Sequence, residues 1–309
     1  MIWPFSKRAS RDSRIGIALD PLRGGSVAVI ERLGSRLRLR HRGTCAAPAD
    51  GDWHSGLSAL LGEHHEPLNA VASDGTYQLL LVDRPNVPDA EIAAAVRWKI
   101  REFMTTEVDD SVVDIFDVPP QARGSRNMVY AVASQSESVK QLAHQIRGCG
   151  VPLESIDIAE LCMRNIATQL EQDRFGIAFL LIRGHQGLLT VTRDKILYVI
   201  RQMEIPSGID DAALSGEAMS GVALELQRSL DYFESHYDQR PIRDVVLAPS
   251  ADGISHCAAL AEELAVNVSL LDLNEILETP DQLTPQEQSD CLLAIGAALR
   301  GPDIVELAA

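Results

Sequence analysis

The chain has 309 residues, 46% of them hydrophobic and 23% charged, a composition typical of globular proteins and a length that suits two domains. Its net charge of −16 repels nucleic acid and anionic lipid, so we expect no nucleic-acid partner. Its five cysteines are scattered without a CxxC pair, which argues against zinc or redox chemistry.

No apolar run approaches the roughly 18 residues that a membrane span needs. In the N-terminal segment 1–14 the basic residues follow the aromatic ones, the reverse of a signal peptide. We therefore expect a cytoplasmic protein with no transmembrane segment.

The first half predicts a β-meander that leads into a mixed α/β segment. The first predicted elements are strands at 15–19, 27–33 and 36–41, a helix near 55–62 and a strand at 77–82. Then follow a helix at 89–104, strands at 112–118 and 128–134, a helix at 137–148 and an extended piece at 155–158. The strand at 77–82 is apolar throughout its middle, which predicts a central place in a covered sheet. We assign residues 1–165 to a first domain, with an inserted α/β subdomain at about 84–158.

The helix at 89–104 has a predicted buried face and a candidate contact face. The buried face consists of Ile92, Val96, Ile100 and Phe103, at intervals of four, four and three residues. Trp98 lies at the flank of that face, where it either packs in the core or contacts a partner. Arg97 and Arg101 pair with acidic groups of a partner, pair with their own neighbours Glu102 and Glu91, or face solvent. Arg97, Trp98 and Arg101 are our candidate partner-binding residues.

The second half, residues 166–309, forms the second predicted domain. Its predicted elements are strands at 176–182, 188–192 and 196–200, a helix at 216–237, a strand at 244–248, a helix at 255–264, a strand at 267–271 and a helix at 285–300. Three antiparallel strands followed by alternating strands and helices is the element order of the ribonuclease-H-like fold, and the first half opens in the same order. We predict a bilobed, actin-like α/β fold, with the helix at 285–300 packing back at the domain interface.

The residues also carry a family likeness. The collinear segments 77–82, 93–99, 108–114, 130–133, 139–148, 150–153, 156–161, 225–233 and 294–300 resemble those of PilM-like type IV pilus assembly proteins. Within that family they most resemble members from mannose-sensitive haemagglutinin (MSHA) pilus systems. The resemblance implies a protein held at the cytoplasmic face of the inner membrane. There it would bind the cytoplasmic tail of a PilN-like membrane protein, in a groove beside the inserted subdomain, near other pilus assembly components.

Actin-like proteins bind ATP through Gly-rich hairpins and an acidic residue that positions metal-bound water. The first hairpin here keeps Asp20 and the turn Gly24, Gly25 and Ser26, which are our candidate nucleotide-binding residues. Ala28 stands where relatives have a lysine. An ordinary β-turn is the simpler interpretation of the same residues.

The second hairpin departs further, since Leu181 and Arg183 occupy the positions of the family's Asp and Gly. The loop 248–254 lacks the paired glycines on which an adenine ring lies. We therefore expect no ATPase activity, no metal and no cofactor, with residual binding of Mg-ATP as the alternative.

The sequence leaves three functions to be compared. The first is a scaffold that docks a PilN-like tail, and the second is an ATP-binding switch that regulates the docking. The third, phosphotransfer of the sugar or acetate kinase type, needs intact phosphate loops, and no other catalytic motif is present. An aspartate facing glycine backbone in the cleft favours the nucleotide functions, whereas leucine and arginine there favour the scaffold.

Overall fold

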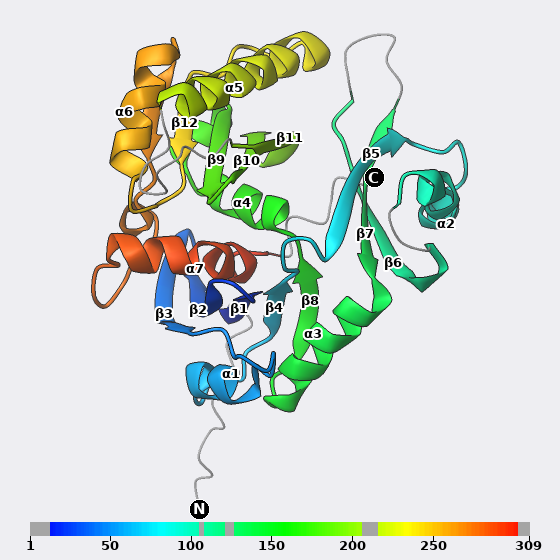
Figure 1. Ribbon diagram of the computed structural model, residues 1–309, viewed down its shortest axis with the longest axis vertical. Coiled ribbons are helices and arrows are strands. Elements are labelled where there is room, and N and C mark those ends of the chain that lie inside the picture. The colour runs from blue at the N-terminus through cyan, green and yellow to red at the C-terminus, as the bar shows by residue number, and fades with distance from the viewer. Residues whose placement is uncertain (1–12, 105–107, 121–126, 206–215, 302–309) are drawn as a thin grey trace, which may run out of the picture.

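The computed structural model describes residues 13–104, 108–120, 127–205 and 216–301, so most of the N-terminal segment lies outside the described residues. Figure 1 shows two lobes, one for each half of the chain, with a smaller sheet at the side of the molecule. None of the helices among the described residues combines the length and the apolarity that a membrane span needs.

The first lobe is built on a five-stranded sheet in the order β3-β2-β1-β4-β8. Its strands are β1 (Ser13–Asp20), β2 (Gly24–Leu33), β3 (Arg36–Cys45), β4 (Leu68–Val71) and β8 (Leu153–Asp157). The first three pair antiparallel, and β4 and β8 continue the sheet parallel to β1. Helices α1 (His54–Leu61) and α3 (Ser136–Gly148) contribute to the apolar cluster on one face of this sheet.

The second lobe repeats the same strand arrangement in the order β11-β10-β9-β12-β13. Its strands are β9 (Ile177–Arg183), β10 (Gln186–Arg193), β11 (Ile196–Glu204), β12 (Asp244–Leu247) and β13 (Asn267–Leu270). Helices α5 (Gly216–Tyr237) and α6 (Gly253–Glu263) pack on it. The stripe of α5 that spacing predicts to be interior, Val222, Leu226, Leu230, Phe233 and Tyr237, is buried. The predicted duplication of one α/β unit is therefore confirmed.

A separate three-stranded sheet has the order β5-β7-β6, with β5 (Tyr77–Asp83), β6 (Ser111–Asp117) and β7 (Met128–Gln135). The prediction that the strand at 77–82 is central was wrong, because β5 is an edge strand and β7 lies in the middle. One side of β5 packs toward α2 through Leu80 and Val82, and its other side faces the second lobe through Leu79. Contact on two sides, rather than a central position, explains its apolar sequence.

Helix α2 (Asp89–Lys99) ends earlier than predicted and continues as a short 3₁₀ helix at Ile100–Glu102. Ile92, Val96 and Ile100 are buried as expected. The prediction of a buried Phe103 was wrong, since its side chain is 62% exposed. The 3₁₀ turn has three residues per turn instead of 3.6, so it rotates Phe103 away from the apolar face.

Two helices lie between the large sheets, α4 (Ala159–Ala167) and α7 (Pro285–Ala298). The apolar cluster around them contains residues of both sheets, including Ile30 and Phe179. The approach between the two helices is close: a Cβ on Gly296 of α7 would lie 2.5 Å from the carbonyl oxygen of Cys162 in α4. Our domain boundaries remain predictions, and the third sheet begins with β5, ahead of residue 84.

Candidate functional site

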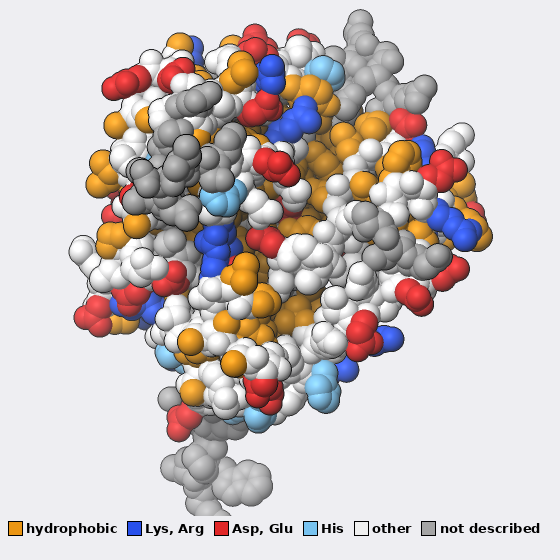
Figure 2. Space-filling model, viewed as in Figure 1, with side chains coloured by type: hydrophobic (Ala, Val, Ile, Leu, Met, Phe, Trp, Pro, Cys, Tyr) orange, Lys and Arg blue, Asp and Glu red, His pale blue; other side chains and the backbone are white. Residues whose placement is uncertain are grey.

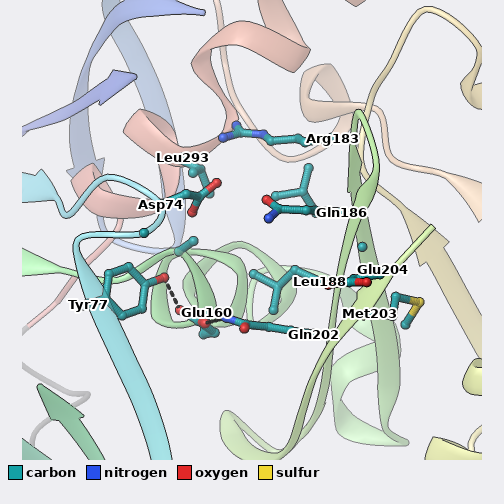
Figure 3. A pocket seen from close by; sticks show the side chains of 14 residues that line it. Asp74, Tyr77, Glu160, Arg183, Gln186, Leu188, Gln202, Met203, Glu204 and Leu293 are labelled. Atoms are coloured by element: carbon teal, nitrogen blue, oxygen red, sulfur yellow. Dashed lines mark hydrogen bonds between the residues drawn. The ribbon is translucent and has the colours of Figure 1, made fainter. Parts of the chain in front are cut away.

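Two neighbouring cavities open between the lobes, one of about 400 Å³ and one of about 250 Å³. Asp74, Arg183 and Leu293 border both. The walls of the larger cavity come from the loop after β4, the first turn of α4, the hairpin between β9 and β10, the end of β11 and one side of α7 (Figure 3). The smaller cavity adds the turn between β1 and β2 and the end of β3. This arrangement places both hairpins of the predicted nucleotide site at one cleft.

The smaller cavity is bordered by all four candidate nucleotide-binding residues, Asp20, Gly24, Gly25 and Ser26. The carboxylate of Asp20 is already engaged by its own turn. Its Oδ1 accepts hydrogen bonds from the backbone N–H of Leu22 at 2.8 Å and of Arg23 at 3.2 Å, and Oδ2 lies 3.7 Å from Arg23 Nε. Asp20 therefore stabilises the β-turn between β1 and β2, as in the simpler interpretation of this hairpin.

The glycines of this turn have structural reasons to be glycine. Gly24 has φ +108°, and a Cβ there would lie 2.3 Å from the carbonyl oxygen of Cys45. A Cβ on Gly25 would lie 3.0 Å from both Cys45 Sγ and Trp53 Cζ3. Packing against β3 and the start of α1 accounts for both residues without a ligand.

The second hairpin supplies Leu181 and Arg183 to the wall of the larger cavity, so leucine and arginine stand in the cleft. The guanidinium of Arg183 makes no hydrogen bond and no ion pair with the residues that the structure describes, and the side chain is half-buried at the cleft. Burial, followed by the charge of Arg23, lowers the pKa of the Arg183 guanidinium.

A buried carboxylate on α4 forms the floor of the larger cavity. Glu160 Oε2 accepts a hydrogen bond from the hydroxyl of Tyr77 at 2.7 Å, and Oε1 accepts one from Gln202 Nε2 at 3.1 Å. Burial raises the pKa of Glu160, and burial with the Glu160 charge raises the pKa of Tyr77 well above its usual value. Sequence reasoning did not single out Glu160 as a site residue, because α4 was not predicted.

The side chains of the cleft can be compared with what a Mg-ATP site requires. Asp20 is held by its own turn, and the apolar side chain of Leu181 cannot orient metal-bound water. The loop 248–254 borders neither cavity. Among the residues that the structure describes, no three His, Cys, Asp or Glu side chains are grouped so as to hold a metal ion.

The candidate partner-binding residues divide into two kinds. Arg97 donates hydrogen bonds to the carbonyl oxygens of Ser111 at 2.8 Å and Asp109 at 3.2 Å, so it holds α2 against the start of β6. Trp98 is 72% exposed, and the Arg101 guanidinium carbon lies 5.9 Å from the centre of its ring. Trp98 and Arg101 are available to a partner, whereas the Arg97 guanidinium is committed to backbone carbonyls.

A second apolar surface lies on the side of the third sheet that faces away from α2. Leu81 is 41% exposed and Val112 is 45% exposed, while Tyr130 on the same side is buried against the second lobe. Figure 2 shows hydrophobic side chains in the hollow between the upper lobe and this part of the molecule. The hollow lies beside the predicted inserted subdomain.

Comparison with known proteins shows what the chain is similar to. No family model and no curated protein matches it. The solved structure of a PilM-PilN type IV pilus biogenesis complex matches with a TM-score of 0.69 and 17% identity, over 93% of this chain and 97% of that one. A Bacteroides thetaiotaomicron protein with an actin-like ATPase fold and unknown function matches with a TM-score of 0.50 and 10% identity, over 87% and 93%.

The cytoplasmic domain of EpsL, an inner-membrane component of the type II secretion system of Vibrio cholerae, also matches, with a TM-score of 0.50 and 10% identity over 94% of this chain and 96% of that domain. At these identities the likeness establishes the fold. The chain has the actin-like ATPase fold, as its element order predicted.

Proposed function

We propose that this protein is an assembly scaffold of a type IV pilus system that docks the cytoplasmic tail of a PilN-like inner-membrane protein. The main support is the similarity to the PilM-PilN complex over 93% of this chain, at a TM-score well above those of the other structures compared. A further match, the EpsL domain, is the cytoplasmic domain of an inner-membrane component of a type II secretion system. The finer proposal is a protein like MshI, the PilM-like member of the MSHA system, held at the inner membrane by its partner.

The cleft supports a scaffold rather than an ATPase. With Asp20 held by its turn and Leu181 in place of a metal-positioning acid, the chain lacks the groups that would activate water on a nucleotide. We infer that the bilobed fold is kept for docking. The alternative, an ATP-binding switch, draws support from the cavity in which Asp20 and the turn Gly24–Ser26 face the second hairpin.

Trp98 and Arg101 are the residues that we propose to meet the tail. An exposed tryptophan beside a guanidinium that pairs with none of the described residues offers a large apolar surface and a donor for an acidic group. The partner segment should therefore carry apolar side chains together with a carboxylate.

The test is binding of a fluorescently labelled peptide that copies the cytoplasmic tail of the PilN-like protein. We expect Trp98→Ala to weaken binding about tenfold or more, equivalent to about 1.4 kcal/mol. Phe175→Ala is the matched control, because Phe175 is a 60% exposed aromatic residue that also has an arginine, Arg174, over its ring, at 4.4 Å. It should leave binding unchanged.

Other results of these binding measurements would change the proposal in specific ways. Peptide binding that neither Trp98→Ala nor Arg101→Met weakens would move the contact to the exposed apolar side chains Leu81 and Val112 on the other side of the third sheet. Failure of the full-length protein to bind the peptide would overturn the docking function. Micromolar binding of Mg-ATP, about −8 kcal/mol, would favour the switch.

A further inference from the structure

Basic residues are concentrated in one part of this acidic chain. Residues 1–45, which end with β3, contain ten Lys and Arg and three Asp and Glu, a net charge of +7. Residues 46–309 contain 18 Lys and Arg and 41 Asp and Glu, a net charge of −23. An asymmetry of this size indicates a surface that binds an anionic partner, although the chain as a whole is strongly negative.

Four arginines cluster on the hairpin that β2 and β3 form, and we call them the arginine face. Two of them share one carboxylate, since Arg36 Nη1 lies 3.1 Å from Glu278 Oε1 and Arg38 Nη2 lies 3.4 Å from Glu278 Oε2. A third lies 3.7 Å from Glu31, and the fourth makes no ion pair with the described residues. The arginine face consists of Arg32, Arg36, Arg38 and Arg40.

The surroundings of the arginine face do not cancel its charge. Four guanidinium groups meet the two carboxylates of Glu31 and Glu278. Next to them, Arg42 pairs with Glu287 at 2.9 Å, and Asp281 borders the same hollow as Arg42. Basic groups remain in excess when these neighbours are included.

The ion pairs of the arginine face leave its arginines able to bind an anion. Arg36, Arg38 and Arg40 are exposed, and ion pairs between exposed side chains contribute little to stability. A guanidinium has five N–H donors, so it can donate to a phosphate oxygen while a carboxylate stays beside it.

The segment before β1 brings further charges to the same end of the sheet. Ser13, the first residue of β1, is paired with Glu31, so residues 1–12 join the sheet beside the arginine face. Six residues span at most about 20 Å, which keeps the basic residues of this segment within reach of that surface. The segment contains three basic residues, Lys7, Arg8 and Arg11, and three large apolar ones ahead of them, Ile2, Trp3 and Phe5.

We propose that the arginine face and residues 1–12 together bind the surface of an anionic phospholipid bilayer. Basic side chains are attracted to anionic headgroups, and tryptophan and other aromatic side chains favour the level of those headgroups. The segment 1–12 carries both kinds, which favours lipid over an acidic protein segment. Stable peripheral binding takes two signals, and here an apolar one and a basic one lie on the same side of the molecule.

The charge distribution also sets the orientation on the bilayer. The rest of the chain is repelled by anionic lipid, so binding is favourable only with the arginine face toward the headgroups. The pair Asp20 and Gly24, at the other end of β1, borders the cleft. A protein bound in this way keeps the cleft turned away from the lipid. This inference does not rest on the proposed docking function, because the lipid is contacted directly and not through a membrane partner.

The test is vesicle flotation with the full-length protein alone, in the absence of any membrane partner. We expect it to bind vesicles of equimolar phosphatidylglycerol and phosphatidylcholine about tenfold or more tightly than vesicles of phosphatidylcholine. Raising NaCl from about 0.1 M to about 1 M shortens the Debye length from about 10 Å to about 3 Å and should weaken the binding several-fold.

Two fourfold variants with the same net charge locate the contact. Replacing all four residues of the arginine face by Gln should weaken binding to the anionic vesicles about tenfold or more. The matched control should retain binding, and it replaces four exposed arginines of the second lobe by Gln: Arg201, Arg228, Arg240 and Arg243. Circular dichroism checks that both variants fold. Trp3→Ala combined with Phe5→Ala should weaken binding several-fold and leave its salt dependence in place, because the arginines remain.

Several results would overturn the proposal. They are no binding to the anionic vesicles at about 0.1 M NaCl, equal binding to neutral vesicles, and equal effects of the two fourfold variants. Binding of poly-L-glutamate by a protein that does not bind the vesicles would assign the arginine face to an acidic protein segment instead. The lipid and salt comparisons use the parent protein, so they decide the matter even if a fourfold variant does not fold.

Discussion

The hydroxyl of Tyr77 donates a hydrogen bond to Glu160 Oε2 at 2.7 Å, and this bond joins the first residue of β5 to the first turn of α4. Gln202, from β11, donates to the other oxygen at 3.1 Å. Figure 3 shows the Glu160 carboxylate between these two side chains. The buried carboxylate of Glu160 in α4 therefore connects this helix to the third sheet and to β11 of the second lobe.

The first prediction concerns the Tyr77 hydroxyl. Tyr77→Phe removes a donor from a buried carboxylate, which should lower the free energy of unfolding by about 1 to 2 kcal/mol. Tyr198→Phe is the control, because the half-buried hydroxyl of Tyr198 donates to no group among the described residues. It should change the free energy by less than about 0.5 kcal/mol. Urea denaturation measures both, and equal effects would contradict a specific role for the Tyr77 bond.

The second prediction concerns the pH dependence of Glu160. Its pKa in the folded protein is raised by burial above the ordinary 4.5, so the native state binds the proton more tightly than the unfolded state. The resulting stabilisation is complete below pH 4.5 and is lost as pH rises through the raised folded pKa.

Glu160→Gln removes this titration. The difference in unfolding free energy, parent minus variant, should therefore decrease as pH rises from about 4.5 toward neutrality. Urea titrations of both proteins at a series of pH values measure it, and taking the difference removes the titrations that they share. A difference that stays constant or increases with pH would contradict the raised pKa.

Much of the fold could be predicted from local patterns. The α5 stripe from Val222 to Tyr237 is buried as its spacing predicts, and the order of strands and helices indicated the duplicated fold. What escaped prediction was β4 and α4, two short elements with buried polar residues. Asn69 of β4 donates to the carbonyl of Ala297 at 3.0 Å, and Asn165 of α4 donates to the carbonyl of Gly296 at 2.9 Å.

These asparagines interrupt the apolar pattern of their elements, and their partners lie more than a hundred residues away in α7. Single-sequence periodicity cannot detect such a compensation. The candidate site shows the same division between local features, which the sequence predicts, and contacts between distant residues, which it does not. Asp20 and its turn could be found because their contacts are local, whereas the approach of Arg23 to the turn at Gly184 depends on how the two lobes pack.

The third prediction separates Arg97 from Arg101. Arg97→Met should lower the free energy of unfolding by about 1 to 3 kcal/mol, because the carbonyls of Ser111 and Asp109 lose a charged donor. Arg101→Met, at a more exposed position, should change it by less than about 0.5 kcal/mol. Thermal or urea unfolding checks both. If Arg97→Met weakened tail binding while stability stayed unchanged, Arg97 would be a contact residue after all.

The fourth prediction uses two helical glycines with opposite surroundings. A Cβ on Gly296 would lie 2.5 Å from the Cys162 carbonyl oxygen, so Gly296→Ala must force α7 away from α4. We expect it to destabilise the protein by about 3 kcal/mol or more, or to prevent folding. Gly221, at an exposed position in the first third of α5, has no atom within 4 Å of a built Cβ.

Gly221→Ala should therefore stabilise the protein by about 0.5 to 1 kcal/mol, because alanine restricts the unfolded chain and favours the helix. Urea denaturation of both variants, with circular dichroism as the readout, measures the contrast. If Gly296→Ala were as stable as the parent protein, α4 and α7 would have room to separate. Their close contact would then not be what fixes the two lobes at the observed spacing.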